Sequence, residues 1–209
     1  MFAALTGLGL STAAGLNAYI PLMVVGLLAH FTDAVKLPAQ YGWLSEGWVL
    51  AIVAVLLTAE FVLDKVPVVD HVNDIIQTAV RPAAGGVVFS ATTAAAQLDH
   101  STWMAEHPAV AWMLGIVVAL VVHLVKAGAR PVVNATTVGV GAPIVSTVED
   151  ASSLGMSLIA VFLPVLVIVA IAVLALVGWR LVRRVRRYRR SRRERAGTAP
   201  AGQPGESTW

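Results

Sequence analysis

Long apolar stretches recur along the chain, and they are of two kinds. Three are strongly aliphatic and reach or approach the roughly 20 residues that a membrane-spanning helix needs. These are Trp48–Leu63, Ala109–Val125 and Leu154–Leu181. Three others are rich in Gly, Ala, Ser and Thr, which let helices pack closely inside a bilayer. These are Ala3–Phe31, Pro82–Leu98 and Val132–Val148. The pattern predicts an all-α, polytopic membrane helical bundle with about six transmembrane spans.

Basic residues are unevenly placed along the chain, and their placement predicts its orientation. Ten of the fifteen lie between Arg180 and Arg195, and the positive-inside rule puts that segment in the cytoplasm. With six crossings, four of the five remaining basic residues also lie on the cytoplasmic side, and only Lys36 lies outside. Those inside are Lys65, Arg81, Lys126 and Arg130. The sequence therefore predicts a multi-pass membrane protein with both termini in the cytoplasm.

Composition separates two regions of the chain. Residues 1–181 are expected to form a transmembrane helical domain, and residues 182–209 a basic and then disordered cytoplasmic tail. From Ala196 the chain is rich in Gly, Pro, Ser and Thr, which is typical of disorder. An arginine run directly after a membrane helix indicates contact with anionic lipid head groups rather than with nucleic acid. The expected partner is the lipid bilayer, and a homo-oligomer or a membrane partner is left open.

Several kinds of chemistry are excluded by the residues present. The chain has no cysteine, which removes disulfides, thiolate metal sites and cysteine nucleophiles. The amino-terminal residues lack the basic region that a cleaved signal peptide needs. Gly139-Val140-Gly141 is no dinucleotide fingerprint, because no strand–turn–helix pattern surrounds it. No catalytic residue, cofactor or metal ion is assigned, and the sequence indicates a protein that is not an enzyme.

A weak internal similarity links two of the aliphatic stretches. GWVLAIVAVLL, which begins at Gly47, is similar to AWMLGIVVALV, which begins at Ala111. Downstream, PVVD at Pro67 aligns with PVVN at Pro131. Repeated helical hairpins, as in many transporters, would explain the similarity. Chance similarity between aliphatic helices would explain it as well, and both explanations stay open.

Polar groups inside membrane spans are costly and usually face a bundle interior or a water-filled cavity. Asn17 lies mid-span before Pro21, which breaks the hydrogen bond to the Asn17 carbonyl. This is either a broken helix that exposes backbone groups to a substrate or a kink satisfied by neighbouring helices. Glu60 and Asp64 share one helix face. Glu60 is either a protonatable coupling group or an interfacial acid paired with a basic residue. The candidate partners of Glu60 are Lys65, Arg81 and Lys126.

The densest polar segment follows Pro67. At helical spacing, one polar stripe is expected along it, made of Asp70, Asp74, Gln77 and Arg81. His71 and Asp74 are three residues apart and could share a divalent metal, although no established ligand spacing is matched. A cytoplasmic helix capped by Asp70 is the favoured alternative.

Further along the chain, a second set of polar groups flanks the last small-residue stretch. His123, Lys126 and Arg130 precede Asn134 and the glycine-rich break Gly139-x-Gly141-x-Pro143. Glu149 and Asp150 follow that break. These two acids are expected to cap the start of the last span. The glycine-rich break itself indicates either a second broken helix or close packing of small residues.

Three blocks of the sequence resemble one bacterial membrane family, catalogued as domain of unknown function 4126. The blocks are LSTAAGLNAYIPLMVVGLL, AEFVLDKVPVVDHVNDIIQTAVRPAAG and PIVSTVEDASSLGMSLIAVFLPVL. The resemblance covers nearly the whole chain up to about Trp179. It implies a multi-span protein of the bacterial cytoplasmic membrane and implies no activity.

Two classes of function remain on these observations. One is a small-solute or ion transporter or a channel-like protein, and the other is a structural or partner-binding membrane subunit. A lipid head-group enzyme using His71 and Asp74 is least supported, because no nucleophile–base pair can be argued. The candidate functional residues are Asn17, Glu60, Asp64, Lys65, Asp70, His71, Asp74, Gln77, Arg81, Asn134, Glu149 and Asp150.

Overall fold

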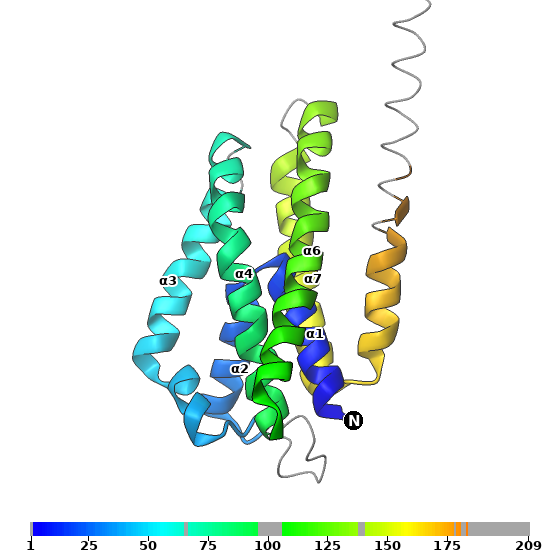
Figure 1. Cartoon of the computed structure of the whole chain (residues 1–209). Helices are drawn as coiled ribbons and strands as arrows, with labels where there is room; N and C mark the ends of the chain where they lie inside the picture. The colour runs from blue at the N-terminus through cyan, green and yellow to red at the C-terminus, as the bar shows by residue number, and fades with distance from the viewer. Residues whose placement is uncertain are drawn as a thin grey trace, which may run out of the picture. The chain divides into compact units, whose positions relative to one another are not determined.

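The computed structural model of the chain describes residues 2–64, 67–95, 106–137 and 141–177, together with residues 179, 180 and 183. Every regular element in these residues is a helix (Figure 1). The elements are α1 (Phe2–Leu16), α2 (Tyr19–Phe31), the 3₁₀ helix η1 (Ala39–Ser45), α3 (Gly47–Leu63), α4 (Pro67–Ala95), α6 (Pro108–Thr137) and α7 (Gly141–Phe162). A further apolar helix covers Leu166–Val177. The expected all-α fold is therefore confirmed for the described chain.

The chain divides into two compact units. Residues 1–173 form the first and residues 174–209 the second. In the second unit, the Arg183 guanidinium carbon lies 3.9 Å from the Trp179 ring centroid, a cation–π contact. The rest of the predicted tail lies outside the described residues.

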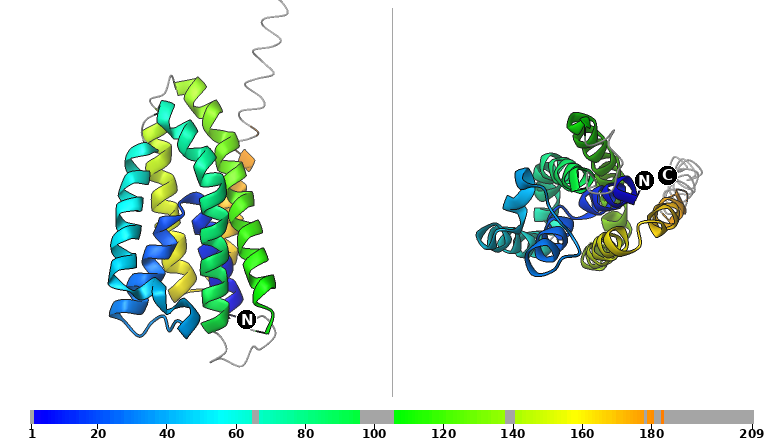
Figure 2. Two further views of the ribbon diagram at one scale, coloured as in Figure 1. Left: turned by 60° about the vertical axis from the view of Figure 1, so that its left-hand side comes forward. Right: turned by 90° about the horizontal axis from the view of Figure 1, so that it is seen from below.

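The first two helices of the large unit form a hairpin. α1 has 15 residues and α2 has 13, so each is about 20 Å long, well short of the roughly 30 Å hydrocarbon core. Figures 1 and 2 show α1 running into the bundle and α2 returning toward the end from which α1 started. The helices are interrupted at Asn17 and Ala18. The break before Pro21 is thus confirmed, but the expectation of one continuous span over Ala3–Phe31 is wrong.

The longer helices run alternately up and down beside this hairpin. α3 and α6 run in one direction, and α4 and α7 in the other (Figures 1 and 2). α4 packs along α6, and α1 lies against α4, α6 and α7. The contact between α4 and α6 is close, because a Cβ atom on Gly115 would lie 2.3 Å from the Gly85 carbonyl oxygen. The Ser11 hydroxyl of α1 also donates to that oxygen, at 2.9 Å.

Two further span boundaries differ from the prediction. The stretch Val132–Val148 is no single helix, because α6 continues to Thr137 and α7 begins at Gly141. The stretch Leu154–Leu181 is interrupted, since α7 ends at Phe162 and the next helix begins at Leu166. Pro164 explains the interruption, because it has no N–H to continue the helical ladder.

The suggested repeat is not reproduced downstream of its matching helices. Pro67 is the first residue of α4, whereas its counterpart Pro131 lies inside α6. Asn134 in that segment also belongs to α6. Glu149 and Asp150 lie well inside α7, eight and nine residues after its first residue, Gly141. The expectation that they cap the start of a final span is therefore wrong.

Apolar and polar residues are distributed as a lipid environment requires. Large aliphatic side chains on the outer helix faces are more than half exposed, such as Val55 (68%), Ile144 (65%) and Val121 (55%). Arg81, Asn17 and Ser153 are each 0% exposed inside the bundle. By length and composition, Pro108–Arg130 and Gly141–Phe162 can each cross a membrane. Counting η1 and α3 as one span bent by 57° gives a third among the described residues, so six spans are not confirmed.

Candidate functional site

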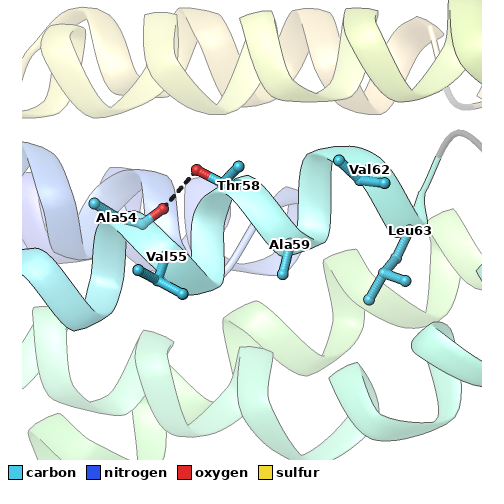
Figure 3. A pocket seen from close by; sticks show the side chains of 6 residues that line it. All are labelled: Ala54, Val55, Thr58, Ala59, Val62 and Leu63. Atoms are coloured by element: carbon cyan, nitrogen blue, oxygen red, sulfur yellow. Dashed lines mark hydrogen bonds between the residues drawn. The ribbon is translucent and has the colours of Figure 1, made fainter.

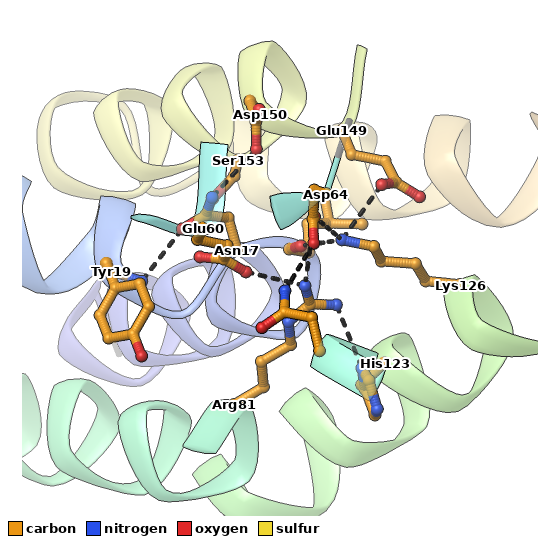
Figure 4. Close-up of polar contacts among 12 residues, drawn as sticks. Asn17, Tyr19, Glu60, Asp64, Arg81, His123, Lys126, Glu149, Asp150 and Ser153 are labelled. Atoms are coloured by element: carbon orange, nitrogen blue, oxygen red, sulfur yellow. Dashed lines mark hydrogen bonds and ion pairs between the residues drawn. The ribbon is translucent and has the colours of Figure 1, made fainter. Parts of the chain in front are cut away.

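Six ionisable side chains from four helices meet inside the large unit. We call them the charge cluster (Figure 4). They are Glu60 of α3, Asp64 just after α3, Arg81 of α4, Lys126 and Arg130 of α6, and Glu149 of α7. Three are acidic and three are basic, so the cluster is neutral when every member is ionised. Five of the six residues are at most 6% exposed, Glu149 being the exception. A group of this kind is held by mutual pairing, because a lone buried charge is strongly unfavourable.

Asp64 is the centre of the charge cluster. Its Oδ2 atom lies 2.9 Å from Arg130 Nη2, 3.4 Å from Lys126 Nζ and 3.7 Å from Arg81 Nη2. Its Oδ1 atom accepts a hydrogen bond from Asn73 Nδ2 at 2.7 Å. Both carboxylate oxygens are therefore compensated, and Asp64 joins α3 to α4 and α6.

Arg81 connects the centre of the cluster to Glu60. Its Nη2 atom donates to Glu60 Oε1 at 2.8 Å, and its Nη1 atom lies 3.1 Å from His123 Nδ1. The other ring nitrogen of His123 lies 3.0 Å from the Thr78 hydroxyl. Arg81 is fully buried and Glu60 is 2% exposed. Arg81 is thus a direct ion-pair partner of Glu60, as one of the three possibilities expected, and Lys65 lies outside the described residues.

Glu149 closes the cluster from α7. Its Oε2 atom lies 2.7 Å from Arg130 Nη2 and 3.1 Å from Lys126 Nζ. Lys126 and Arg130 are four residues apart and so point from the same face of α6. Each of these two cations therefore bridges Asp64 and Glu149, which ties α7 to α3 through α6.

The tip of the α1–α2 hairpin reaches this cluster. Lys126 Nζ donates to the Leu16 carbonyl oxygen at 2.8 Å, where the C-terminal end of α1 carries partial negative charge. Asn17 Oδ1 accepts from the backbone N–H groups of Tyr19 and Ile20 at 3.0 and 3.2 Å. Asn17 Nδ2 donates to Asp150 Oδ1 at 2.9 Å. The structure thus combines parts of the two sequence interpretations: the helix is broken at Asn17, and the polar groups at the break are paired by Asn17 and by neighbouring helices.

The structure brings together seven of the predicted candidate residues. These are Asn17, Glu60, Asp64, Gln77, Arg81, Glu149 and Asp150. The side chains of the other five lie outside the described residues. They are Lys65, Asp70, His71, Asp74 and Asn134. The suggested metal pair of His71 and Asp74 therefore lies outside them too, and the described residues contain no group of three or more His, Cys, Asp or Glu that could hold a metal ion.

Three contributors were not selected from the sequence as site residues although a signal was present. Asn73 precedes Gln77 and Arg81 by one and two helical turns, so 73, 77 and 81 form a stripe at intervals of four. The stripe that the sequence suggested used Asp70 and Asp74 in place of Asn73. Lys126 was expected only as a pairing partner and Arg130 only as part of the polar group before Asn134, although their spacing of four indicated one shared face.

The outer face of α3 carries a shallow hollow that is unrelated to the charge cluster. It is lined by Ala54, Val55, Thr58, Ala59, Val62 and Leu63 (Figure 3). Its one polar side chain, Thr58, donates to the Ala54 carbonyl oxygen at 2.8 Å. An apolar face with a satisfied hydroxyl is what lipid chains require, and it offers no group that could do chemistry.

Asn17→Leu is expected to destabilise the hairpin tip by about 2 kcal/mol, because α2 loses its side-chain cap and Asp150 loses a hydrogen-bond donor. Hydrogen exchange of the Tyr19 and Ile20 amides in detergent should speed up in this variant. Thr58→Val is the matched control, since it removes one hydroxyl from the lipid-facing side of α3. Unchanged exchange at both amides would show that Asn17 does not hold the tip.

Comparison with known proteins gives one match. No curated protein and no solved structure matches the chain. The family described as a domain of unknown function (DUF4126) matches residues 4–184, which include every residue of the charge cluster. The resemblance seen in the three sequence blocks is confirmed by this match, and the chain belongs to the DUF4126 family.

Proposed function

We propose that this protein is a transporter or channel-like protein for a small solute or ion in the bacterial cytoplasmic membrane. The observation that carries the proposal is a helical hairpin that ends inside the bundle, against a buried cluster of ion pairs. Broken helices of this kind place backbone dipoles within the membrane, where transporters bind substrates and coupling ions. Buried ionisable groups in membrane helices usually mark such pathways.

The proposed orientation follows from the positions of the basic residues. α3 ends, α4 begins and α6 ends at one end of the large unit, while the hairpin opens at the other (Figure 2). The positive-inside rule favours the cytoplasm for the end that carries Arg130, and the outside for the end that carries Lys36. α1 begins at the outer end in this arrangement. Its start is therefore proposed outside the cytoplasm, in place of the cytoplasmic amino terminus that six full crossings require.

A structural membrane subunit is the second candidate. The dense pairing favours it, because Asp64 and Glu149 are each bonded to two or more cations. Such bridges hold helices together whether or not a solute passes. The two candidates differ in what they expect of solute flux, so one experiment separates them.

Glu60→Gln should reduce solute flux through the protein to the level of protein-free liposomes. The variant keeps the size of the side chain but removes the charge that pairs with Arg81. Osmotic swelling and shrinking of proteoliposomes can be followed by stopped-flow light scattering with glycerol, urea, ammonium chloride and potassium chloride as probes. Glu46→Gln is the matched control, because Glu46 is an exposed acid outside the cluster.

Both variants should remain folded, which gel filtration and thermal unfolding can check. If wild-type protein and empty liposomes give equal rates for all four probes, transport of these solutes is excluded. The function supported best would then be that of a structural membrane subunit.

A further inference from the structure

The two carboxylate oxygens of Glu60 differ in their hydrogen bonding. Oε1 accepts a hydrogen bond from Arg81 at 2.8 Å. Oε2 is buried and has no hydrogen-bond partner among the described residues. Buried polar atoms are nearly always hydrogen-bonded, and an exception needs an explanation such as a ligand.

A second buried acceptor, on α4, lacks a donor as well. Gln77 lies one helical turn before Arg81, so both side chains leave the same face of α4. Its side chain lies near the Tyr19 hydroxyl, and its Oε1 atom is buried without a partner among the described residues. Gln77 is 2% exposed. Glu60 Oε2 and Gln77 Oε1 therefore lack donors, and Arg81 Nε lacks an acceptor among the described residues. Of these atoms, the carboxylate oxygen is the one that can take up a proton.

The charges of the surrounding groups point in the same direction. The charge cluster is neutral by itself, and Asp150 at the hairpin tip adds one further acid beside it. Asp64 and Glu149 each contact two or more cations, and Asp150 accepts from Asn17. Within the charge cluster, Glu60 is the carboxylate with the fewest cation partners, because its one ion pair is at a single oxygen.

We infer that Glu60 is a proton-binding site, with Arg81 as its movable counter-ion. A hydronium ion transfers its proton to Oε2 and leaves as water, so that the carboxylate becomes a carboxylic acid with an O–H donor. The loss of charge weakens the ion pair at Oε1. Arg81 Nη2 already lies 3.7 Å from Asp64 Oδ2 and closes on that atom instead. Proton uptake thereby shifts a side chain that links α3, α4 and α6.

A proton suits this position better than a metal cation. The Arg81 guanidinium lies within hydrogen-bond distance of the same carboxylate and would repel a metal ion. The described residues also lack a group of three or more His, Cys, Asp or Glu placed to ligate one. A proton needs only the free oxygen, and it adds the missing donor.

Several ionisable groups determine the electrostatic potential at Glu60. On the hairpin and α3 they are Tyr19 and Asp64, on α4 Arg81, on α6 His123, Lys126 and Arg130, and on α7 Glu149 and Asp150.

The inference rests on the proposed function in one respect: proton binding drives transport only if a transported solute exists. The site itself can be tested without any flux.

Infrared difference spectroscopy on the full chain in lipid vesicles tests the proton site. Lowering the pH from about 9 to about 4 covers the range of ordinary and buried carboxyl groups. We expect a carbonyl stretching band of a protonated carboxyl group that Glu60→Gln abolishes and Glu46→Gln retains. With ¹⁵N-labelled arginine, a guanidinium band should shift in the same pH interval, and the shift should vanish in Asp64→Asn, which has no carboxylate to receive Arg81.

Two results would overturn the inference. If wild-type and Glu60→Gln spectra are identical throughout the titration, Glu60 binds no exchangeable proton. If the carboxyl band appears but the guanidinium band never shifts, Arg81 is a fixed partner. Solute flux in the swelling assay without the Glu60 band leaves transport standing and removes the proton site. The Glu60 band without solute flux leaves the proton site standing and removes transport of the probe solutes.

Discussion

Replacing Arg81 with methionine should lower the free energy of unfolding by about 3–5 kcal/mol, the cost of leaving a buried charge without its partner. Arg81 is fully buried and bonds Glu60, His123 and, more distantly, Asp64. Methionine fills much of the same volume, so the loss comes from charge and hydrogen bonding rather than from a cavity. The measurement is an unfolding titration in mixed micelles, followed by circular dichroism.

The double variant Arg81→Met with Glu60→Leu separates the ion pair from the packing around it. Replacing both members of a buried ion pair by apolar residues is often neutral or stabilising, so the double variant should regain most of the loss. Equal stability of the single variant and the wild type would show that Glu60 is uncharged in the folded protein. A double variant as unstable as the single one would show that Arg81 acts mainly through His123 and Asp64.

The charge cluster could be predicted in part because helical spacing places residues on shared faces. Glu60 and Asp64 are four apart, and so are Gln77 and Arg81, which made their common faces visible in the sequence. Spacing cannot say which faces of different helices meet. The direct pair of Glu60 with Arg81 therefore remained one of three alternatives until the helices were placed.

The direction of the first two helices could not be predicted for a different reason. Hydropathy along Ala3–Phe31 reports that the segment is apolar, and Pro21 reports that its helix breaks. Neither reports that the chain turns back. The turn is stabilised by contacts of high sequence separation, since Lys126 bonds the Leu16 carbonyl and Asp150 bonds Asn17.

The boundary between α6 and α7 shows the limit of placing helix ends from hydropathy. The expected spans Ala109–Val125 and Val132–Val148 were separated by a segment that contains Lys126 and Arg130. α6 instead continues through Pro131 to Thr137. The expected span Val132–Val148 therefore combined parts of two antiparallel helices.

Gly115→Ala should destabilise the protein by about 2–3 kcal/mol, at the upper end of what overpacking usually costs. The added Cβ atom would lie 2.3 Å from the Gly85 carbonyl oxygen and 2.7 Å from Phe89 Cβ. The first of these is a backbone atom, which also accepts a hydrogen bond from Ser11. It cannot move aside without separating α4 from α6 and α1, so the strain falls on the centre of the bundle.

Gly128→Ala is the control for this prediction because it makes the same change in the same helix. A Cβ atom on Gly128 meets no atom within 4 Å, and replacing glycine by alanine inside a helix contributes up to about 1 kcal/mol of stability. Gly128→Ala should therefore unfold no earlier than the wild type, while Gly115→Ala unfolds clearly earlier in the same micelles. Similar unfolding curves for the two variants would mean that α4 and α6 do not pack through Gly85 and Gly115. The position of Arg81 opposite His123 and Lys126 depends on that packing, so the charge cluster would then have to be assembled in another way.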